Sequence, residues 1–293
     1  MEKIRFRINQ MPEASPGLSL ALGNFDGFHR GHQDLFVKTS VDASAESGVL
    51  IFDSPFGHGP ILSSTEDKLR YALHSRLDRA YVFEGGQELY ALTPEQFIEQ
   101  VLLPLGTKRV VVGEDFRFGA NRAGGPDTLG RYFQVDIVPL RKEDGQKISS
   151  SSIKSLISQG NLEKAASYLG KPYEVCGKVV EGFHNGAKLG FPTVNLQLDA
   201  NYVLPKSGVY CGVCYVGGIA YRAMVNVGVN PTLGKLTAPI IETHLLDYEG
   251  QCYGKTVYCA FLTHIRDEIK FSSLEELKKQ LERDEIAVKD TLS

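Results

Sequence analysis

The sequence lacks the features that would place it outside the soluble globular proteins. Its 293 residues carry a formal net charge of −3, so the basic excess typical of nucleic-acid-binding proteins is missing. No run of 18 apolar residues is present that would span a bilayer. The charged stretch MEKIRFRINQ has no apolar core behind it, which argues against a signal peptide. We therefore expect a cytoplasmic protein that binds neither nucleic acid nor membrane.

Cysteine is also scarce, and the five residues of this type all lie in the second half of the chain. An odd count without an export signal argues against a disulfide framework. Cys211 and Cys214 have the C-x-x-C spacing of half a zinc site, but they fall in GVYCGVCYV, which is typical of a strand. Residues three apart on a strand point to opposite faces. Because Cys252 and Cys259 form no second closely spaced pair, we expect the cysteines to pack as small apolar side chains.

Short apolar runs alternate with helix-like segments over the first part of the chain, to about residue 160. This rhythm predicts an α/β domain with a parallel sheet covered by helices on both sides. Ligands of such sheets bind beyond the carboxyl ends of the strands, where the topology switches. The predicted strands are 18–22, 49–52, 80–83, 109–112 and 135–140.

Two helices have clear signals. At 93–103, Thr93 and Gln96 are suited to form a capping box around Pro94. From about residue 273 an amphipathic helix, capped by Ser272 or Ser273, is expected to end the chain. Its predicted buried stripe is Leu274, Leu277 and Leu281.

The rhythm of the sequence changes at Gly170, which ends a short helical segment just before Pro172. Short stretches rich in valine, tyrosine and threonine follow at close spacing, punctuated by glycine and proline. This pattern predicts an antiparallel β-barrel, closed or nearly so. We therefore expect two domains, at 1–170 and 171–293.

The stretch GNFDGFHRGH lies where the first predicted strand turns into a helix. A glycine-rich turn at this place leaves backbone N–H groups facing outward in front of the positive end of the helix, which suits a phosphate group. His29 and His32 would add donors or positive charge beside the phosphates, as a transition state that gains negative charge requires. Two simpler interpretations stay open. Either the histidines are zinc ligands, although no third ligand is offered nearby, or they only cap a turn.

A second glycine-rich stretch, GFHNGAKLGFPTVN, begins at residue 182. Its glycines permit close approach of backbone to phosphate. Thr193 and Asn195 project from one face of an extended segment, where their oxygens can reach one magnesium ion. An ordinary glycine-rich hairpin explains the same residues, and the residues alone favour it. The later GKT at 254–256 is no P-loop, because Glu249 replaces the first glycine of that motif and the segment enters a strand.

A series of segments resembles the prokaryotic bifunctional riboflavin kinase/FMN adenylyltransferases, also called FAD synthetases. FDGFHRGH is similar to the histidine signature of the nucleotidylyltransferase superfamily. The match continues along almost the whole chain. The other segments are GEDFRFGANRAG, ISSSSIK, LGKPYEVCGKVVEG, LGFPTVNL, NVGVNPTLG, IETHLLDYEGQCYG and IRDEIKFSSLEEL.

The resemblance implies that the first domain is a nucleotidylyltransferase domain, doubly wound and Rossmann-like, which joins AMP from ATP to FMN and releases pyrophosphate. It assigns His29 and His32 to catalysis. The ATP- and phosphate-binding residues that it implies are Gly23, Phe25, Asp26, Gly31, Ser150, Ser151 and Lys154. Those of the flavin and nucleotide loop are Asp115, Phe116, Arg117 and Arg122.

The resemblance also implies that the C-terminal barrel is a riboflavin kinase, which phosphorylates riboflavin to FMN. Glu242 aligns with the family's general base, which accepts the proton of the ribityl 5′-hydroxyl group, and partial burial would raise its pKa toward a useful value. The family's Pro-Thr-Ala-Asn motif makes Thr193 and Asn195 the magnesium–ATP ligands, with Val194 as a departure. Further implied contacts with ATP are Gly186, Lys188 and Gly190. Arg266 is a candidate for a contact with the flavin or the phosphates, and an ordinary surface arginine is the alternative.

Two departures from the family fall in the first half. Pro55 and His58 match its Thr-Phe-x-Pro-His-Pro stretch only in part, and Lys154 replaces an arginine whose forked donors match phosphate better.

Our leading hypothesis is a bifunctional enzyme that uses magnesium, ATP, riboflavin and FMN and is a monomer or weak homo-oligomer. One alternative is a riboflavin kinase whose first domain binds nucleotide or flavin without adenylyl transfer. Another is a metal- or RNA-binding module built around the histidines and cysteines.

Overall fold

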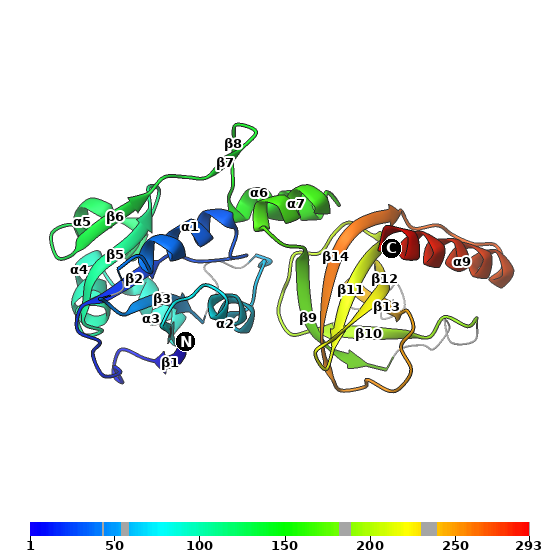
Figure 1. Ribbon diagram of the computed structural model, residues 1–293, viewed down its shortest axis with the longest axis horizontal. Helices are drawn as coiled ribbons and strands as arrows, with labels where there is room; N and C mark the ends of the chain where they lie inside the picture. The colour runs from blue at the N-terminus through cyan, green and yellow to red at the C-terminus, as the bar shows by residue number, and fades with distance from the viewer. Residues whose placement is uncertain (43, 54–58, 182–188, 230–238, 293) are drawn as a thin grey trace. The chain divides into compact units, whose positions relative to one another are not determined.

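The computed structural model describes residues 1–42, 44–53, 59–181, 189–229 and 239–292. They form two compact units, Met1–Ser150 and Ser151–Ser293 (Figure 1). The helical segment before residue 170 thus falls in the second unit. The domain boundary at residue 170, which we inferred from the change in sequence pattern, stays a prediction. Among the described residues, no helix is both long and apolar enough to cross a membrane.

A six-stranded parallel sheet forms the centre of the first unit, in the order β1-β4-β3-β2-β5-β6. Its strands are β1 (Glu2–Phe6), β2 (Leu18–Leu22), β3 (Ser47–Phe52), β4 (Arg79–Phe83), β5 (Thr107–Gly113) and β6 (Gln134–Val138). β2 and β3 are buried along their whole length, as expected of parallel strands that helices cover on both faces. The predicted parallel sheet is confirmed.

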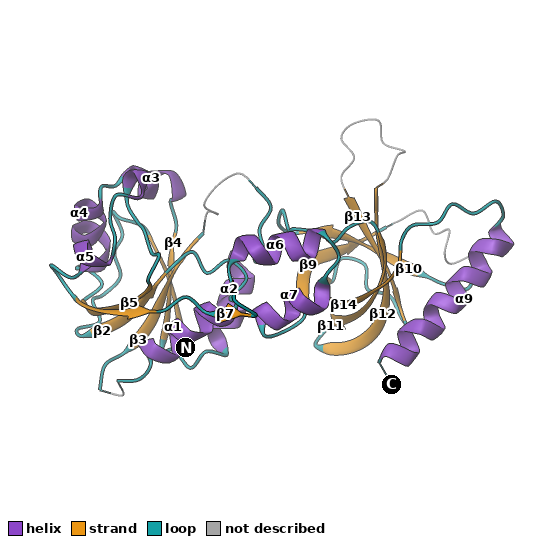
Figure 2. Ribbon diagram, turned by 90° about the horizontal axis from the view of Figure 1, so that it is seen from above, coloured by secondary structure: helices purple, strands orange, loops and turns teal. Residues whose placement is uncertain are grey.

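Helices cover both faces of this sheet, and each face has its own apolar core. On one face, α1 (Arg30–Thr39) and α2 (Thr65–Leu73) pack their buried residues against the strands. On the other face, residues of the remaining helices do so. These helices are α3 (Gly86–Ala91), α4 (Pro94–Phe97), η1 (Ile98–Leu102) and α5 (Pro126–Leu129), with a 3₁₀ turn, η2 (Ala120–Arg122), before α5. Figure 2 shows α1 and α3 on opposite sides of the strands.

The capping signal at Thr93 is confirmed, but the helix that follows is not a single α-helix. The Thr93 N–H donates to Gln96 Oε1 at 2.9 Å, and the Gln96 N–H donates to Thr93 Oγ1 at 3.2 Å. After α4 the helix widens into a π-turn, η1, in which the Leu103 N–H reaches the Ile98 carbonyl at 2.9 Å. Single π-turns of this kind occur inside α-helices and change the direction of the residues that follow.

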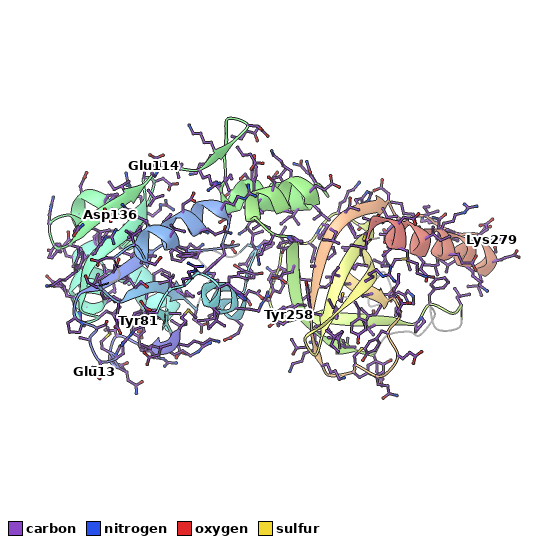
Figure 3. All side chains as sticks on the ribbon, viewed as in Figure 1. Glu13, Tyr81, Glu114, Asp136, Tyr258 and Lys279 are labelled. Carbon is purple, nitrogen blue, oxygen red and sulfur yellow. The ribbon has the colours of Figure 1, made fainter. Side chains whose placement is uncertain are left out.

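Sequence reasoning missed β1, the edge strand that pairs with β4. Charged residues alternate with apolar ones in EKIRF, and only Phe6 is fully buried. At the other end of the sheet, β6 stops at Val138, two residues before the predicted end. Figure 3 labels Tyr81 within the sheet, where it is fully buried in the core.

The second unit begins with two short helices and continues as a closed barrel of six antiparallel strands, in the order β10-β13-β12-β11-β14-β9. β9 pairs with both β10 and β14, which closes the barrel. The predicted barrel is confirmed. Its helices are α6 (Ser150–Ser158) and α7 (Leu162–Leu169); its strands are β9 (Tyr173–Val180), β10 (Thr193–Leu198), β11 (Gly208–Val216), β12 (Ile219–Val229), β13 (Pro239–Leu245) and β14 (Thr256–Arg266).

A terminal helix, α9 (Leu274–Thr291), packs on the outside of this barrel (Figures 1 and 2). Ser273 caps it by accepting a hydrogen bond from the Glu276 N–H at 3.2 Å, as predicted. The predicted buried stripe is wrong at its start, because Leu274 is 70 % exposed. The contact with the barrel lies farther along, around Leu281 and Val288.

Candidate functional site

The histidine turn, residues Gly23–His32, leaves the sheet at the carboxyl end of β2. In the strand order, β2 lies between β3 and β5, and the later strands add outward on both sides. The loop after β5 opens at the same edge, because parallel strands end on the same side. The turn therefore occupies the topological switch point, where doubly wound sheets bind their ligands.

The Asp26 carboxylate fixes the shape of this turn. It is buried and accepts hydrogen bonds from the backbone N–H groups of Leu62 at 2.8 Å and Ser63 at 3.1 Å. Phe25 and Phe28 adopt positive φ angles of 52° and 49°, which are unfavourable for residues with a bulky side chain. Strained backbone that its surroundings hold in place is common at ligand sites. Asp26 thus braces the turn, and its assignment to phosphate binding stays a prediction.

Two glycines of the turn lie against aromatic rings. A Cβ atom at Gly23 would lie 2.9 Å from the Phe25 ring, which is too close for any side chain unless that ring moves. A Cβ atom at Gly31 would lie 3.3 Å from the His29 ring. Glycine at these two places therefore lets the rings occupy the space beside the backbone.

His29 and His32 stack at the start of α1, with ring centroids 3.6 Å apart. Burial lowers the pKa of His29 to about 4, against a smaller raising effect of Asp26. Burial and the neighbouring His29 also lower the pKa of His32. Both imidazoles are therefore neutral near pH 7, so they offer hydrogen bonds rather than positive charge. The Nδ1 atom of each ring is buried and has no hydrogen-bond partner among the described residues.

Two other predicted residues lie beside the turn. The Ser150 hydroxyl donates to the backbone carbonyl of Asp26 at 2.8 Å. Asp115, in the loop after β5, forms an ion pair with Lys147 at 2.6 Å. Both charges of this pair act on His29, the lysine lowering its pKa and the aspartate raising it. Lys147 is therefore part of the site, although sequence reasoning missed it.

Lys147 lies on a small hairpin of β7 (Lys142–Glu143) and β8 (Gln146–Lys147). The two residues between these strands, Asp144 and Gly145, have φ angles of 51° and 75°. Positive φ at both central residues is the signature of a type I′ turn, for which Asp-Gly is a preferred sequence. This dipeptide was the signal that would have revealed the hairpin.

The loop after β5 also carries the other predicted flavin-site residues. Phe116 stacks on a second phenylalanine of the loop, with ring centroids 5.7 Å apart. Arg117 and Arg122 are exposed. Ser151 and Lys154 belong to the second unit, near the start of α6. The roles of these residues stay predictions.

A second candidate site lies on the outer face of the barrel, where β10, β13 and β12 are neighbours. Asn195 of β10 lies opposite Glu242 of β13, which lies opposite Asn226 of β12. Residues opposite one another on antiparallel strands share a face and are in contact range. Thr193 lies on the same face, opposite His244. The register thus brings together the three residues that the sequence assigned to ATP and proton transfer.

Glu242 points away from the barrel interior. Its neighbours Ile241 and Thr243 are fully buried, and successive side chains of a strand alternate between faces. Partial burial raises the pKa of Glu242, and a hydrogen bond from the Asn226 side chain opposes this rise. A carboxylate with a moderately raised pKa is suited to accept a proton near neutral pH.

The chemistry of Thr193 and Asn195 fits a magnesium ion. Their side-chain oxygens lie on the same face of β10, and oxygen ligands are those that a hard cation prefers. Asn195 is only 9 % exposed. His244, beside Thr193, is held by a hydrogen bond of 2.8 Å between its Nδ1–H and the Pro192 carbonyl and by the edge of the Phe191 ring.

The chain matches two family models, one in each unit. Residues 11–152 match the FAD synthetase model, and residues 169–292 match the riboflavin kinase model. Curated relatives named bifunctional riboflavin kinase/FMN adenylyltransferase include one of Bacillus subtilis, 32 % identical over 90 % of this chain and 89 % of its own length. Another, of Escherichia coli K12, is 32 % identical over 99 % of this chain and 97 % of its own.

The chain belongs to the bifunctional riboflavin kinase/FMN adenylyltransferase family. This confirms the resemblance found in the sequence. A solved structure from Streptococcus pneumoniae, named as a macrolide-efflux protein, is 29 % identical and superposes with a TM-score of 0.86 over 98 % of this chain and 99 % of its own.

The family's glycine-rich ATP stretch lies partly outside the described residues. Gly186 and Lys188 fall in 182–188, and Pro55 and His58 fall in 54–58, so these four predictions are not among the residues that the structure describes. Gly190 is described and has a φ of 89°, which favours glycine. Thr256 opens β14, in agreement with the rejection of a P-loop at that place.

Arg266, the candidate flavin contact, joins β14 to α9. Its guanidinium group donates to both carboxylate oxygens of Asp284, at distances between 2.8 and 3.0 Å. It also lies over the Phe271 ring, 5.9 Å from the centroid. Asp284 is only 2 % exposed, so this is a desolvated pair within the second unit. A flavin contact of Arg266 stays a prediction.

The C-x-x-C cysteines pack on opposite faces of β11. Cys211 lies outside the barrel wall in the apolar cluster that α9 covers. Cys214 faces its cross-strand neighbour Cys259, and its pKa is raised by this neighbour and by burial. Both are buried thiols, in line with the packing role expected of them.

Proposed function

We propose that this chain makes flavin cofactors by two successive reactions. It phosphorylates riboflavin with ATP to give FMN, and it then joins the AMP of a second ATP to FMN to give FAD and pyrophosphate. The observation that carries the proposal is that one chain holds both arrangements: the braced histidine turn at the switch point of the sheet, and the row of Asn195, Glu242 and Asn226 on the barrel.

In the kinase reaction, Glu242 acts as general base. The 5′-hydroxyl oxygen of riboflavin attacks the γ-phosphorus of ATP, the bond between that phosphorus and ADP breaks, and the hydroxyl proton passes to the Glu242 carboxylate. The partial burial that raises the pKa of Glu242 makes the carboxylate a better proton acceptor than an exposed one. Because Glu242 lies beside Asn195, the base lies next to the residues that would bind ATP.

Thr193 and Asn195 would hold magnesium in this site. A bound magnesium ion supplies positive charge that neutralises the ATP phosphates. The two side chains present their oxygens from the same face of β10, and His244 stands beside Thr193. They thus place the phosphates of ATP over the barrel face that carries Glu242.

In the adenylyl transfer, an oxygen of the FMN phosphate attacks the α-phosphorus of ATP, and the bond to pyrophosphate breaks. No protein nucleophile is needed. His29 and His32, both neutral, donate N–H groups to the oxygens that gain charge, and the N-terminus of the ten-residue helix α1 adds its positive end. Lys147, paired with Asp115, supplies a positive charge close to the histidines.

The test is to incubate the purified protein with riboflavin, ATP and magnesium, and separately with FMN, ATP and magnesium, and to follow FMN and FAD by chromatography. We expect FMN and FAD in the first mixture and FAD in the second. FMN without any FAD would show that the first domain only binds its ligands. The absence of both FMN and FAD from the first mixture would overturn the kinase assignment.

A further inference from the structure

Asn226 touches the proposed base but has no part in the reaction as described above. It lies opposite Glu242 in the register of β12 and β13, and its side-chain amide hydrogen-bonds the Glu242 carboxylate. Val225 and Val227, on either side of it, are buried in the barrel. Asn226 therefore projects onto the same outer face as Glu242.

The Glu268 carboxylate lies near the same part of β12. A Cβ atom at Gly228 would lie 2.7 Å from Glu268 Oε1 and 3.7 Å from the Asn226 Nδ2 atom.

Among the described residues, no charged group contributes to the pKa shift of Glu242. His244 lies two residues along on the same face of β13 and is held by the Pro192 carbonyl. Arg266 and Asp284, between β14 and α9, are paired with each other. On the described part of the barrel face, Asn226 is therefore the side chain that fixes the Glu242 carboxylate by a hydrogen bond.

We propose that Asn226 is a positioning residue that holds the Glu242 carboxylate on the outer face of the barrel, beside Asn195, in the orientation that receives the hydroxyl proton. The inference rests on the proposed kinase function. Because the amide acts through Glu242, its loss should change proton transfer and leave ATP binding in place.

The test compares Asn226→Leu and Asn226→Asp with the unchanged protein in the riboflavin kinase assay. Leucine removes the hydrogen bond, and aspartate replaces the donating amide with a carboxylate that repels Glu242. We expect kcat for riboflavin phosphorylation to fall about tenfold, with the larger loss for aspartate. The KM for ATP should stay within about twofold.

A double variant separates positioning from structure. In the Glu242→Gln background, adding Asn226→Leu should change the residual turnover by less than about twofold, because the group through which it acts is gone. Asn201→Leu, at an exposed loop position of the same unit, is the matched control and should leave kcat unchanged. Circular dichroism and the FAD-forming activity of each variant report whether the chain is folded.

A rise in the KM for ATP without a fall in kcat would overturn the positioning role. So would a further large loss in the Glu242→Gln background. Failure of the proposed function itself looks different, because the unchanged protein would then make neither FMN nor FAD from riboflavin.

Discussion

In the first unit, the two histidines lie three residues apart in one turn, whereas in the second unit Asn195, Glu242 and Asn226 come from three different strands. The turn obtains its shape from local bracing: Asp26 holds the backbone, and glycines make room for aromatic rings. The barrel face obtains its shape from strand register. A contiguous site can be found in the sequence as a motif, but a site built by register exists only after the barrel has closed.

The two sites also differ in how burial and neighbours set the pKa values of their side chains. Burial lowers the pKa of both His29 and His32, so in the proposed reaction they offer neutral N–H donors. On the barrel, partial burial raises the pKa of Glu242, and a hydrogen bond from Asn226 opposes this rise. One consequence is that each reaction should be removable without the other.

The largest expected effect is the loss of kinase activity in Glu242→Gln. Glutamine keeps the shape of the side chain but cannot accept the hydroxyl proton, so kcat for riboflavin phosphorylation should fall by about 10²-fold or more. FAD formation from supplied FMN should stay within about twofold. Glu249→Gln, at an exposed position after β13, is the matched control. A loss of less than about tenfold would show that Glu242 is not the base.

The next largest effect concerns the stability of the barrel unit. Arg266→Ala leaves the buried Asp284 carboxylate unpaired and should lower the free energy of unfolding by about 3–5 kcal/mol, measured by urea denaturation. Arg222→Ala breaks an exposed pair with Asp247 and should cost less than about 1 kcal/mol. Similar costs for the two variants would contradict the view that Arg266 serves to dock α9.

The histidine turn is tested by His29→Ala. Removing one of the stacked donors should slow FAD formation from FMN and ATP by roughly 10²-fold, while riboflavin phosphorylation is unchanged. His74→Ala, at the exposed end of α2, should affect neither reaction. A parallel loss of both activities would mean that the two units do not function independently.

The smallest effect is a pH dependence of stability. Because the pKa of His29 is lowered from 6.5 to about 4 in the folded chain, protons bind the unfolded chain first as the pH falls. The stability due to neutral His29 is complete above pH 6.5 and is lost as the pH falls toward 4, about 2 kcal/mol being gone by pH 5. The difference between the urea unfolding midpoints at pH 7.5 and pH 5 should therefore be smaller in His29→Gln than in the unchanged protein. An identical pH slope in both would contradict burial of the ring.

Strand positions were predictable where the strand is apolar throughout or alternates strictly. The bounds of β2 and β11 agree with the strands expected from the sequence, because burial selects apolar residues in a regular pattern. The sequence pattern did not predict β1, because this edge strand carries charged residues and lacks a continuous apolar run. Leu274 was misassigned because the helix begins before it reaches the barrel, so periodicity alone does not say which turns are covered.

The sequence by itself determined the two-domain order, the parallel and antiparallel sheets, the capping of helices at Thr93 and Ser273, and the family, because these depend on local patterns and contiguous motifs. Only the tertiary structure decided that the histidines are neutral, that Lys147 stands beside them, and that Asn226 faces Glu242. Burial and cross-strand neighbours depend on which distant segments meet, and no spacing along the chain encodes that.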